Sequence, residues 1–329
     1  MAAREHINEY FNGRPFMVLC ALMLTAATVL AVFTGSVSPS VSSTGMFFSL
    51  GHTLTHPGPV PAAINLVCLL ATGLIMLALN KVFNFVRSVT HLFVSTFLLL
   101  QVANPASLTS FNAGTLVALV AAITMWPLFG SYQDRHAQRS IFLIFALIAA
   151  GSMFHYGFLV LLPAYVLGFM NMRALNFKGV LAMLFGLVTP FWIILGLGIV
   201  SPADFKPPMI HGIWQLVGGP HAGLTIVLAA IVAVMGIVLA VMNLLTIMNF
   251  RMQTRVYNAF MVFALVTTVI AMSIDYRDIS FFLPLLGLMV AVQVANTHTL
   301  RTTVHYRYIF MLLLIAGALG FCAAQLIMP

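Results

Sequence analysis

Long apolar runs, each close to the length of a membrane span, fill almost the whole chain and are separated by short polar segments. A helix that crosses the hydrocarbon core of a bilayer needs about 20 predominantly apolar residues. Of the 329 residues, 62% are hydrophobic and only 6% are charged, whereas a soluble domain carries about 25% charged residues. Such a chain cannot cover itself with water-compatible side chains. The sequence therefore predicts an all-α integral membrane protein, with one transmembrane domain over residues 1–329.

The apolar runs divide into about eleven helices by this length criterion. The stretch 141–172 is too long for one span, and we expect a helix break at His155 and Tyr156. Before the first span, residues 1–13 place apolar side chains at helical spacing beside charged ones, which predicts a short interfacial amphipathic helix. The predicted spans are 15–34, 61–80, 88–104, 112–131, 141–154, 157–172, 179–200, 222–248, 257–274, 279–296 and 308–327.

The basic residues give the expected topology. With the N-terminus in the cytoplasm and the helices alternating, roughly twelve of the 14 Lys and Arg residues fall on the inner side, as the positive-inside rule requires. Only Lys206 and Arg277 fall outside. The C-terminus is then external, and the external loops are 35–61, 201–220 and 275–278.

Several function classes are not supported by the sequence. The formal net charge of +8 is dispersed between apolar segments and forms no basic stripe, so nucleic acid is not an expected partner. Cys20, Cys68 and Cys322 lie inside apolar runs without a CxxC spacing, which argues against a disulfide framework or a zinc site. The chain has no P-loop, no dinucleotide fingerprint and no GxSxG motif.

The predicted outer loops carry the residues on which chemistry could depend. Asp204, Asp275 and Asp278 are candidate catalytic acids, and Arg277 could bind a phosphate through its planar guanidinium. We expect these four residues to line one outward cavity that binds an anionic head group. The alternative is that Asp275 and Asp278 only cap the following helix. Further candidate substrate-binding residues are Lys206, His155, Tyr156, His52, His56 and His211.

No cofactor is predicted. The outer histidines have no regular metal-ligand spacing, so no metal site is expected from them. One possibility remains open, in which a loop carboxylate holds a divalent cation that bridges to phosphate.

Two resemblances extend this interpretation. FNGRPF at 11–16, the stretch 154–192, and within it RALNFKG at 173–179 followed by GLVTP at 186–190 resemble an uncharacterised family of polytopic inner-membrane proteins of Bacteroidota, over most of the chain. This resemblance implies a multi-pass protein of the bacterial inner membrane, and it implies no particular activity. More loosely, the many helices and outer-face polar residues resemble the glycosyltransferase C superfamily, in which an acid usually lies in the first outer loop. Here the loop 35–61 has no acidic residue.

The sequence thus leaves different classes of function open. The protein either handles a lipid-linked glycan or related polyprenyl substrate at its outer face, or is a transporter or lipid flippase, or is a non-catalytic membrane subunit of an envelope assembly. The outer acids and Arg277 favour the first, and the missing acid in 35–61 favours the other two. Membrane lipids are expected partners in each case, and the sequence does not determine the oligomeric state.

Overall fold

The computed structural model describes residues 10–34, 45–48, 56–86, 90–207, 220–247, 251–275, 278–300 and 304–327. All regular structure within these ranges is helical. Within the described part of the chain, eight helices are long and apolar enough to cross a membrane, and three further apolar helices are shorter. The predicted class, an all-α protein with membrane-length helices, is confirmed.

The bounds of the helices are as follows. The α-helices are α2 Arg14–Thr34, α4 Pro59–Phe83, α5 Leu92–Val102, α6 Ala113–Gly130, α7 Gln138–Phe154, α8 Leu161–Asn171, α9 Phe177–Gly196, α10 Pro220–Ile247, α11 Met252–Ile274, α12 Ile279–Leu300 and α13 Val304–Ile327. The 3-10 helices are η1 Pro105–Ser107, η2 Tyr156–Val160 and η3 Pro202–Asp204.

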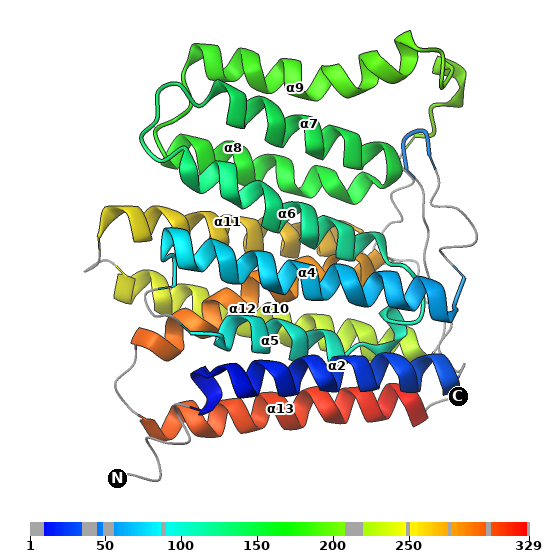
Figure 1. Ribbon diagram of the computed structural model, residues 1–329, viewed down its shortest axis with the longest axis vertical. Helices are drawn as coiled ribbons and strands as arrows, with labels where there is room; N and C mark the ends of the chain where they lie inside the picture. Colours follow the sequence, from blue (N-terminus) through cyan, green and yellow to red (C-terminus); the bar gives the residue numbers. More distant parts are fainter. Residues whose placement is uncertain are drawn as a thin grey trace.

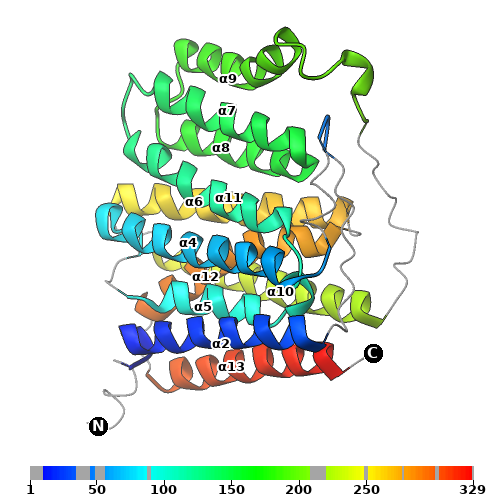
Figure 2. The same ribbon diagram turned by 45° about the vertical axis from the view of Figure 1, so that its right-hand side comes forward.

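The helices lie side by side with their axes roughly aligned, and both views show the same order (Figures 1 and 2). α9 forms one edge of the bundle and packs on α7, while α2 and α13 form the other edge. α12 is the central helix and packs against α5, α6, α10 and α11. In the most apolar stretch of α12, 94% of the residues are buried, whereas in that of α9 only 11% are buried. The core of the bundle is therefore built around α12.

The two ends of the bundle differ in charge. α2 begins at one end and α13 finishes at the other (Figure 1). We call the end at which α2 begins the basic end, and the other the opposite end. The opposite end contains Asp204, Asp275 and Asp278, and Lys206 is the basic residue described there. The basic end is defined by the described residues Arg14, Lys81, Arg135, Arg139, Arg173, Lys178, Arg251 and Arg255.

α5 is shorter than the span predicted over 88–104, so this prediction was too long at both ends. Before α5, the hydroxyl of Thr90 donates to Asn12 Oδ1 at 2.8 Å, and the N–H of His91 donates to the Asn12 carbonyl at 3.2 Å. At the other end Asn104 precedes Pro105, and a residue before proline is disfavoured in a helix. The 11 residues of α5 extend only about 16 Å at 1.5 Å per residue.

The predicted break within 141–172 is confirmed. α7 ends at Phe154, and His155 has an extended backbone with φ −158° and ψ 128°. The His155 side chain then caps the next turn by accepting a hydrogen bond from the N–H of Gly157. Because this side chain satisfies a backbone donor at the start of η2, the chain begins a new helical segment there instead of continuing α7.

The predicted amphipathic helix over 1–13 falls mostly outside the described residues. Within them, residues 10–12 are helical. Phe11 is buried and its ring lies edge-on to Phe16, with centroids 4.9 Å apart. This aromatic contact ties the beginning of the described chain to the first turn of α2.

Candidate functional site

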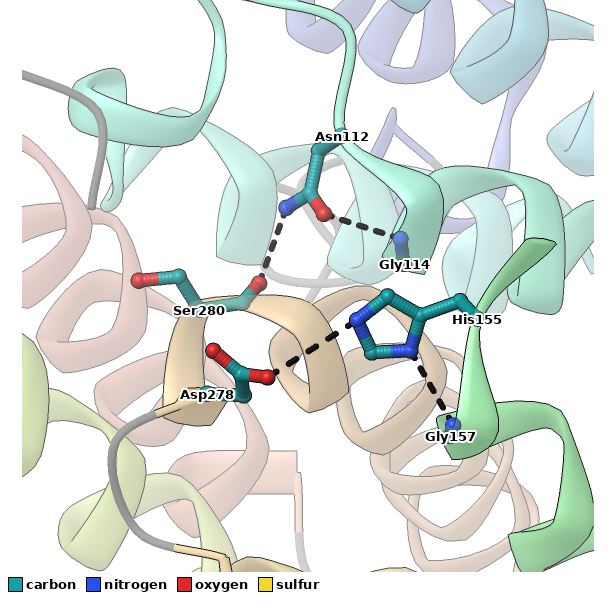
Figure 3. Close-up of polar contacts among 6 residues, drawn as sticks. All are labelled: Asn112, Gly114, His155, Gly157, Asp278 and Ser280. Atoms are coloured by element: carbon teal, nitrogen blue, oxygen red, sulfur yellow. Dashed lines mark hydrogen bonds and ion pairs between the residues drawn. The ribbon is translucent and has the colours of Figure 1, made fainter. Parts of the chain in front are cut away.

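Two of the predicted site residues, His155 and Asp278, meet at the opposite end of the bundle (Figure 3). His155 Nε2 lies 3.7 Å from Asp278 Oδ2, and the two side chains are 5% and 12% exposed. His155 comes from the break between α7 and η2, and Asp278 directly precedes α12. The pair therefore joins two hairpins that are distant in sequence, at a buried position.

The hydrogen bonds of His155 define its protonation pattern when the imidazole is neutral. The Gly157 N–H donates to His155 Nδ1 at 3.0 Å. A ring nitrogen that accepts a hydrogen bond carries no proton, so the proton is on Nε2, the atom that faces Asp278. The Nε2–H then points at a carboxylate that also lies at the N-terminus of α12, where the helix dipole favours negative charge.

The surroundings fix the position of this pair. The His155 ring stacks on Phe281, with centroids 3.8 Å apart and an interplanar angle of 11°. Asn112 Nδ2 donates to the Ser280 carbonyl at 2.9 Å, and Asn112 Oδ1 accepts from the Gly114 N–H at 2.8 Å. These bonds, drawn in Figure 3, hold the first turn of α12 against the start of α6.

This geometry gives the two residues different roles. Nδ1 of His155 is occupied by a backbone donor and Nε2 carries the proton, so the imidazole does not accept a proton while the Gly157 hydrogen bond is intact. Asp278 is the basic group of the pair, and it remains partly accessible. A positioned carboxylate of this kind can act as a general base or as a ligand to a hard cation.

Tyr156 and Lys206 are also brought together, through the backbone of Lys206. The Tyr156 hydroxyl donates to the Lys206 carbonyl oxygen, and the Lys206 N–H donates to the Met46 carbonyl at 3.0 Å. Phe47 adds an edge-on ring contact to Phe205, with centroids 5.9 Å apart. Parts of the predicted outer loops 35–61 and 201–220 therefore meet beside η2, and Lys206 takes part in these hydrogen bonds through its backbone.

The remaining candidates divide into those with local roles and those outside the described residues. Asp204 is exposed and caps η3, because its Oδ2 accepts from the Ser201 N–H at 2.9 Å in a capping box. Asp275 follows the last residue of α11, and its N–H donates to the Ala271 carbonyl. His56 is exposed just before α4.

Arg277, His52 and His211 lie outside the described residues. The shared cavity of Asp204, Asp275, Arg277 and Asp278 therefore remains a prediction. Within the ranges that the structure describes, no group of three or more His, Cys, Asp or Glu residues is arranged to hold a metal ion.

Sequence reasoning missed the residues that position the pair. Asn112 carries a local signal, since Asn is a favoured N-cap residue directly before a helix. Its bond to Ser280, and the stacking of Phe281 on His155, have no such signal, because both join elements distant in the chain.

Comparison with known proteins gives no relative. No protein-family model, no curated protein and no solved structure matches this chain.

Proposed function

We propose that the chain is a multi-pass protein of the bacterial inner membrane that handles a lipid-linked glycan or related polyprenyl substrate at its outer face. In this proposal about eleven helices span the membrane. The N-terminus and the basic end face the cytoplasm, and the C-terminus is external. Asp278 is the reactive carboxylate and His155 is its positioning residue. The observation that carries the proposal is the buried His155–Asp278 pair at the end opposite the basic residues.

The charge asymmetry supports this orientation. Lys and Arg residues near the ends of membrane spans are enriched on the cytoplasmic side, whereas acidic residues contribute little to topology. The described basic residues lie at one end with the exception of Lys206. The His155–Asp278 pair lies at the other end and would face the periplasm, where the loosely similar glycosyltransferase C enzymes act.

The proposed chemistry is glycosyl transfer from a lipid phosphate donor. Asp278 accepts the proton of an acceptor hydroxyl as the acceptor oxygen forms a bond to the anomeric carbon. The bond between that carbon and the phosphate oxygen breaks, and the lipid phosphate leaves with the bonding electron pair. General-base assistance of this kind contributes about 10²–10⁴-fold to a rate. In this scheme Asp278 takes the place of the acid that is missing from the loop 35–61.

The buried pair also supports a second function, transport. Ionisable residues within membrane segments often belong to proton pathways in transporters. A flippase would use the protonation of Asp278 to couple substrate movement to a proton gradient. The two functions differ in the membrane leaflet on which the substrate accumulates when the protein is absent.

A deletion strain tests both functions. We expect a lipid-linked glycan or polyprenyl intermediate to accumulate, measured by mass spectrometry of extracted lipids. Wild-type protein should reverse the accumulation, and Asp278→Asn should not, at equal abundance in the membrane. Asp204→Asn is the matched control, because Asp204 is an exposed carboxylate at the same end.

The side of accumulation distinguishes the two functions. An intermediate on the periplasmic leaflet supports transfer chemistry, and one confined to the cytoplasmic leaflet supports a flippase. An unchanged pool of lipid-linked intermediates in the deletion strain would contradict both.

A further inference from the structure

A chain of buried amide side chains joins α10, α11 and α12 towards the basic end. Asn243 Nδ2 donates to the backbone carbonyl of Gln293 at 2.8 Å and to Gln293 Oε1 at 2.9 Å. Gln293 Nε2 donates to Asn258 Oδ1 at 3.2 Å, and Asn296 Nδ2 donates to the same oxygen at 3.1 Å. Asn258 thus receives two hydrogen bonds from α12 through its oxygen.

A backbone group fixes which amide atoms donate and which accept in this series of hydrogen bonds. The carbonyl of Gln293 can only accept, so the atom of Asn243 that faces it must be the amide nitrogen. That nitrogen also faces Gln293 Oε1, which places Gln293 Nε2 towards Asn258. The atom of Asn258 on this side must then be its oxygen, and its Nδ2 is on the other side. The assignment of the Asn258 amide therefore follows from a group that has no alternative orientation.

Asn258 Nδ2 is left without an acceptor. Asn258 is 2% exposed, and its Nδ2 has no hydrogen-bond partner among the described residues. Arg255 Nε is likewise buried and without a partner in the part of the chain that the structure describes. A buried donor that finds no acceptor loses its hydrogen bonds to water without replacement, which is unfavourable. Two such donors three residues apart on one helix form a candidate site for a group that supplies acceptors.

The two donors share one face of α11. Residues three apart on a helix are neighbours on its surface. Side chains on a helix lean towards its N-terminus, so the Asn258 side chain covers the turn that carries Arg255. Asn258 Nδ2 and Arg255 Nε are both hydrogen-bond donors, and a guanidinium group contains no acceptor atom. The ligand that satisfies them must therefore supply oxygen acceptors.

The charge at this end favours an anion. Of the described acidic residues, Asp134 is the one at the basic end, and it is exposed and accepts from the His136 N–H. No carboxylate within the described ranges forms an ion pair with Arg255, whereas Lys81 adds positive charge to the same end. A phosphate is well matched, because Arg can donate two parallel hydrogen bonds to it.

We propose that Arg255 and Asn258 bind phosphate oxygens in a site between α11 and α12 at the basic end. Arg255 lies three residues after the first residue of α11, or roughly 5 Å along the helix at 1.5 Å per residue. At this depth the phosphate belongs either to the head group of an anionic phospholipid or to a free inorganic phosphate. Basic sites between helices on the cytoplasmic side are known to hold anionic head groups. The site is separate from the His155–Asp278 pair, which lies at the other end.

The test uses the purified full chain in a neutral detergent. Native mass spectrometry measures retention of phosphatidylglycerol against phosphatidylcholine, and thermal unfolding is followed in phosphate and in chloride at equal ionic strength. We expect the wild-type protein to prefer the anionic lipid or to be stabilised by phosphate, and Arg255→Gln to weaken that binding about tenfold. Arg251→Gln is the matched control, since Arg251 has the same charge one turn away and is exposed.

A second variant keeps the test decisive if Arg255→Gln does not fold. Asn258→Asp retains the oxygen that accepts from Gln293 and Asn296, and it replaces the unpartnered Nδ2 by an acceptor for Arg255. We expect this variant to fold and to lose anion binding, because it carries its own anionic partner for Arg255.

The outcomes separate the ligand sources. Selective lipid retention that depends on Arg255 identifies a head group, and stabilisation by phosphate without lipid selectivity identifies free phosphate. Unchanged anion binding in Asn258→Asp, or equal losses in the Arg251 and Arg255 variants, would overturn the site.

Discussion

The imidazole of His155 and the ring of Phe281 stack with their centroids 3.8 Å apart and nearly parallel. One residue lies at the break after α7 and the other in the first turn of α12. The contact requires a close approach of backbone on both sides. A Cβ built on Gly157 would lie 2.0 Å from Phe281 Cε1, and one built on Gly114 would lie 1.9 Å from the Phe281 carbonyl oxygen. The site at the opposite end therefore depends on two glycines.

Gly114→Ala should destabilise the protein. The added methyl group meets a backbone oxygen, which cannot rotate away as a side chain can. Overpacking of this kind costs about 1–3 kcal/mol. The thermal unfolding midpoint in detergent measures the effect. Gly317→Ala is the control, since a Cβ there meets nothing within 4 Å, and Ala is favoured over Gly in a helix by about 0.5–1 kcal/mol. Equal midpoints for the two variants would contradict the close packing at Phe281.

Tyr156→Phe should loosen the junction of the segments 45–48 and 205–206. The substitution removes the hydroxyl that donates to the Lys206 carbonyl, a bond worth about 1 kcal/mol. We expect faster hydrogen exchange in peptides that cover residues 201–207, measured by mass spectrometry. Tyr132→Phe provides the comparison, because the Tyr132 hydroxyl accepts a local hydrogen bond from the side chain of the neighbouring Gln133. No difference between the variants would show that the hydroxyl does not hold the junction.

Asn243→Ala should weaken the packing of α10 on α12. It removes both donations to Gln293 and leaves Gln293 Oε1 buried without that donor. We expect a loss of about 1–2 kcal/mol in unfolding free energy. Thr246→Ala on the same helix is the control, since Thr246 is exposed and bonds only within its own helix. The interpretation fails if both variants unfold at the same denaturant concentration.

Labelling with a membrane-impermeant thiol reagent tests the orientation. In a background in which Cys20, Cys68 and Cys322 are replaced by Ala, a cysteine at Ser201 should react in intact cells. A cysteine at His136 should react only after the membrane is permeabilised. The expectation follows from the basic residues that surround His136 and the positive-inside rule. The reverse pattern would invert the topology and place the His155–Asp278 pair in the cytoplasm.

The accuracy of the sequence predictions differed from element to element. The break at His155 was predicted because 141–172 is too long for one span, and the His155 cap explains it. The predicted span over 88–104 is longer than α5. Thr90 and His91 bond to Asn12 before the helix begins, and a hydropathy pattern contains no information on such contacts. The roles of Asp204 and Asp278 were not separable from sequence, since both are acids near the start of a helical turn.

The class of protein, the approximate positions of the helices and the asymmetry of charge between the two ends follow from the sequence alone. These properties are local, since the apolar length of a segment and the charges that flank it do not depend on its neighbours. Only the packing of the helices brings Asp278 beside His155, lets Asn243 bond to Gln293, and buries Arg255 Nε. Helices that are apolar on every side carry little signal for which face meets which neighbour, so contacts between distant segments exist only once the helices have packed.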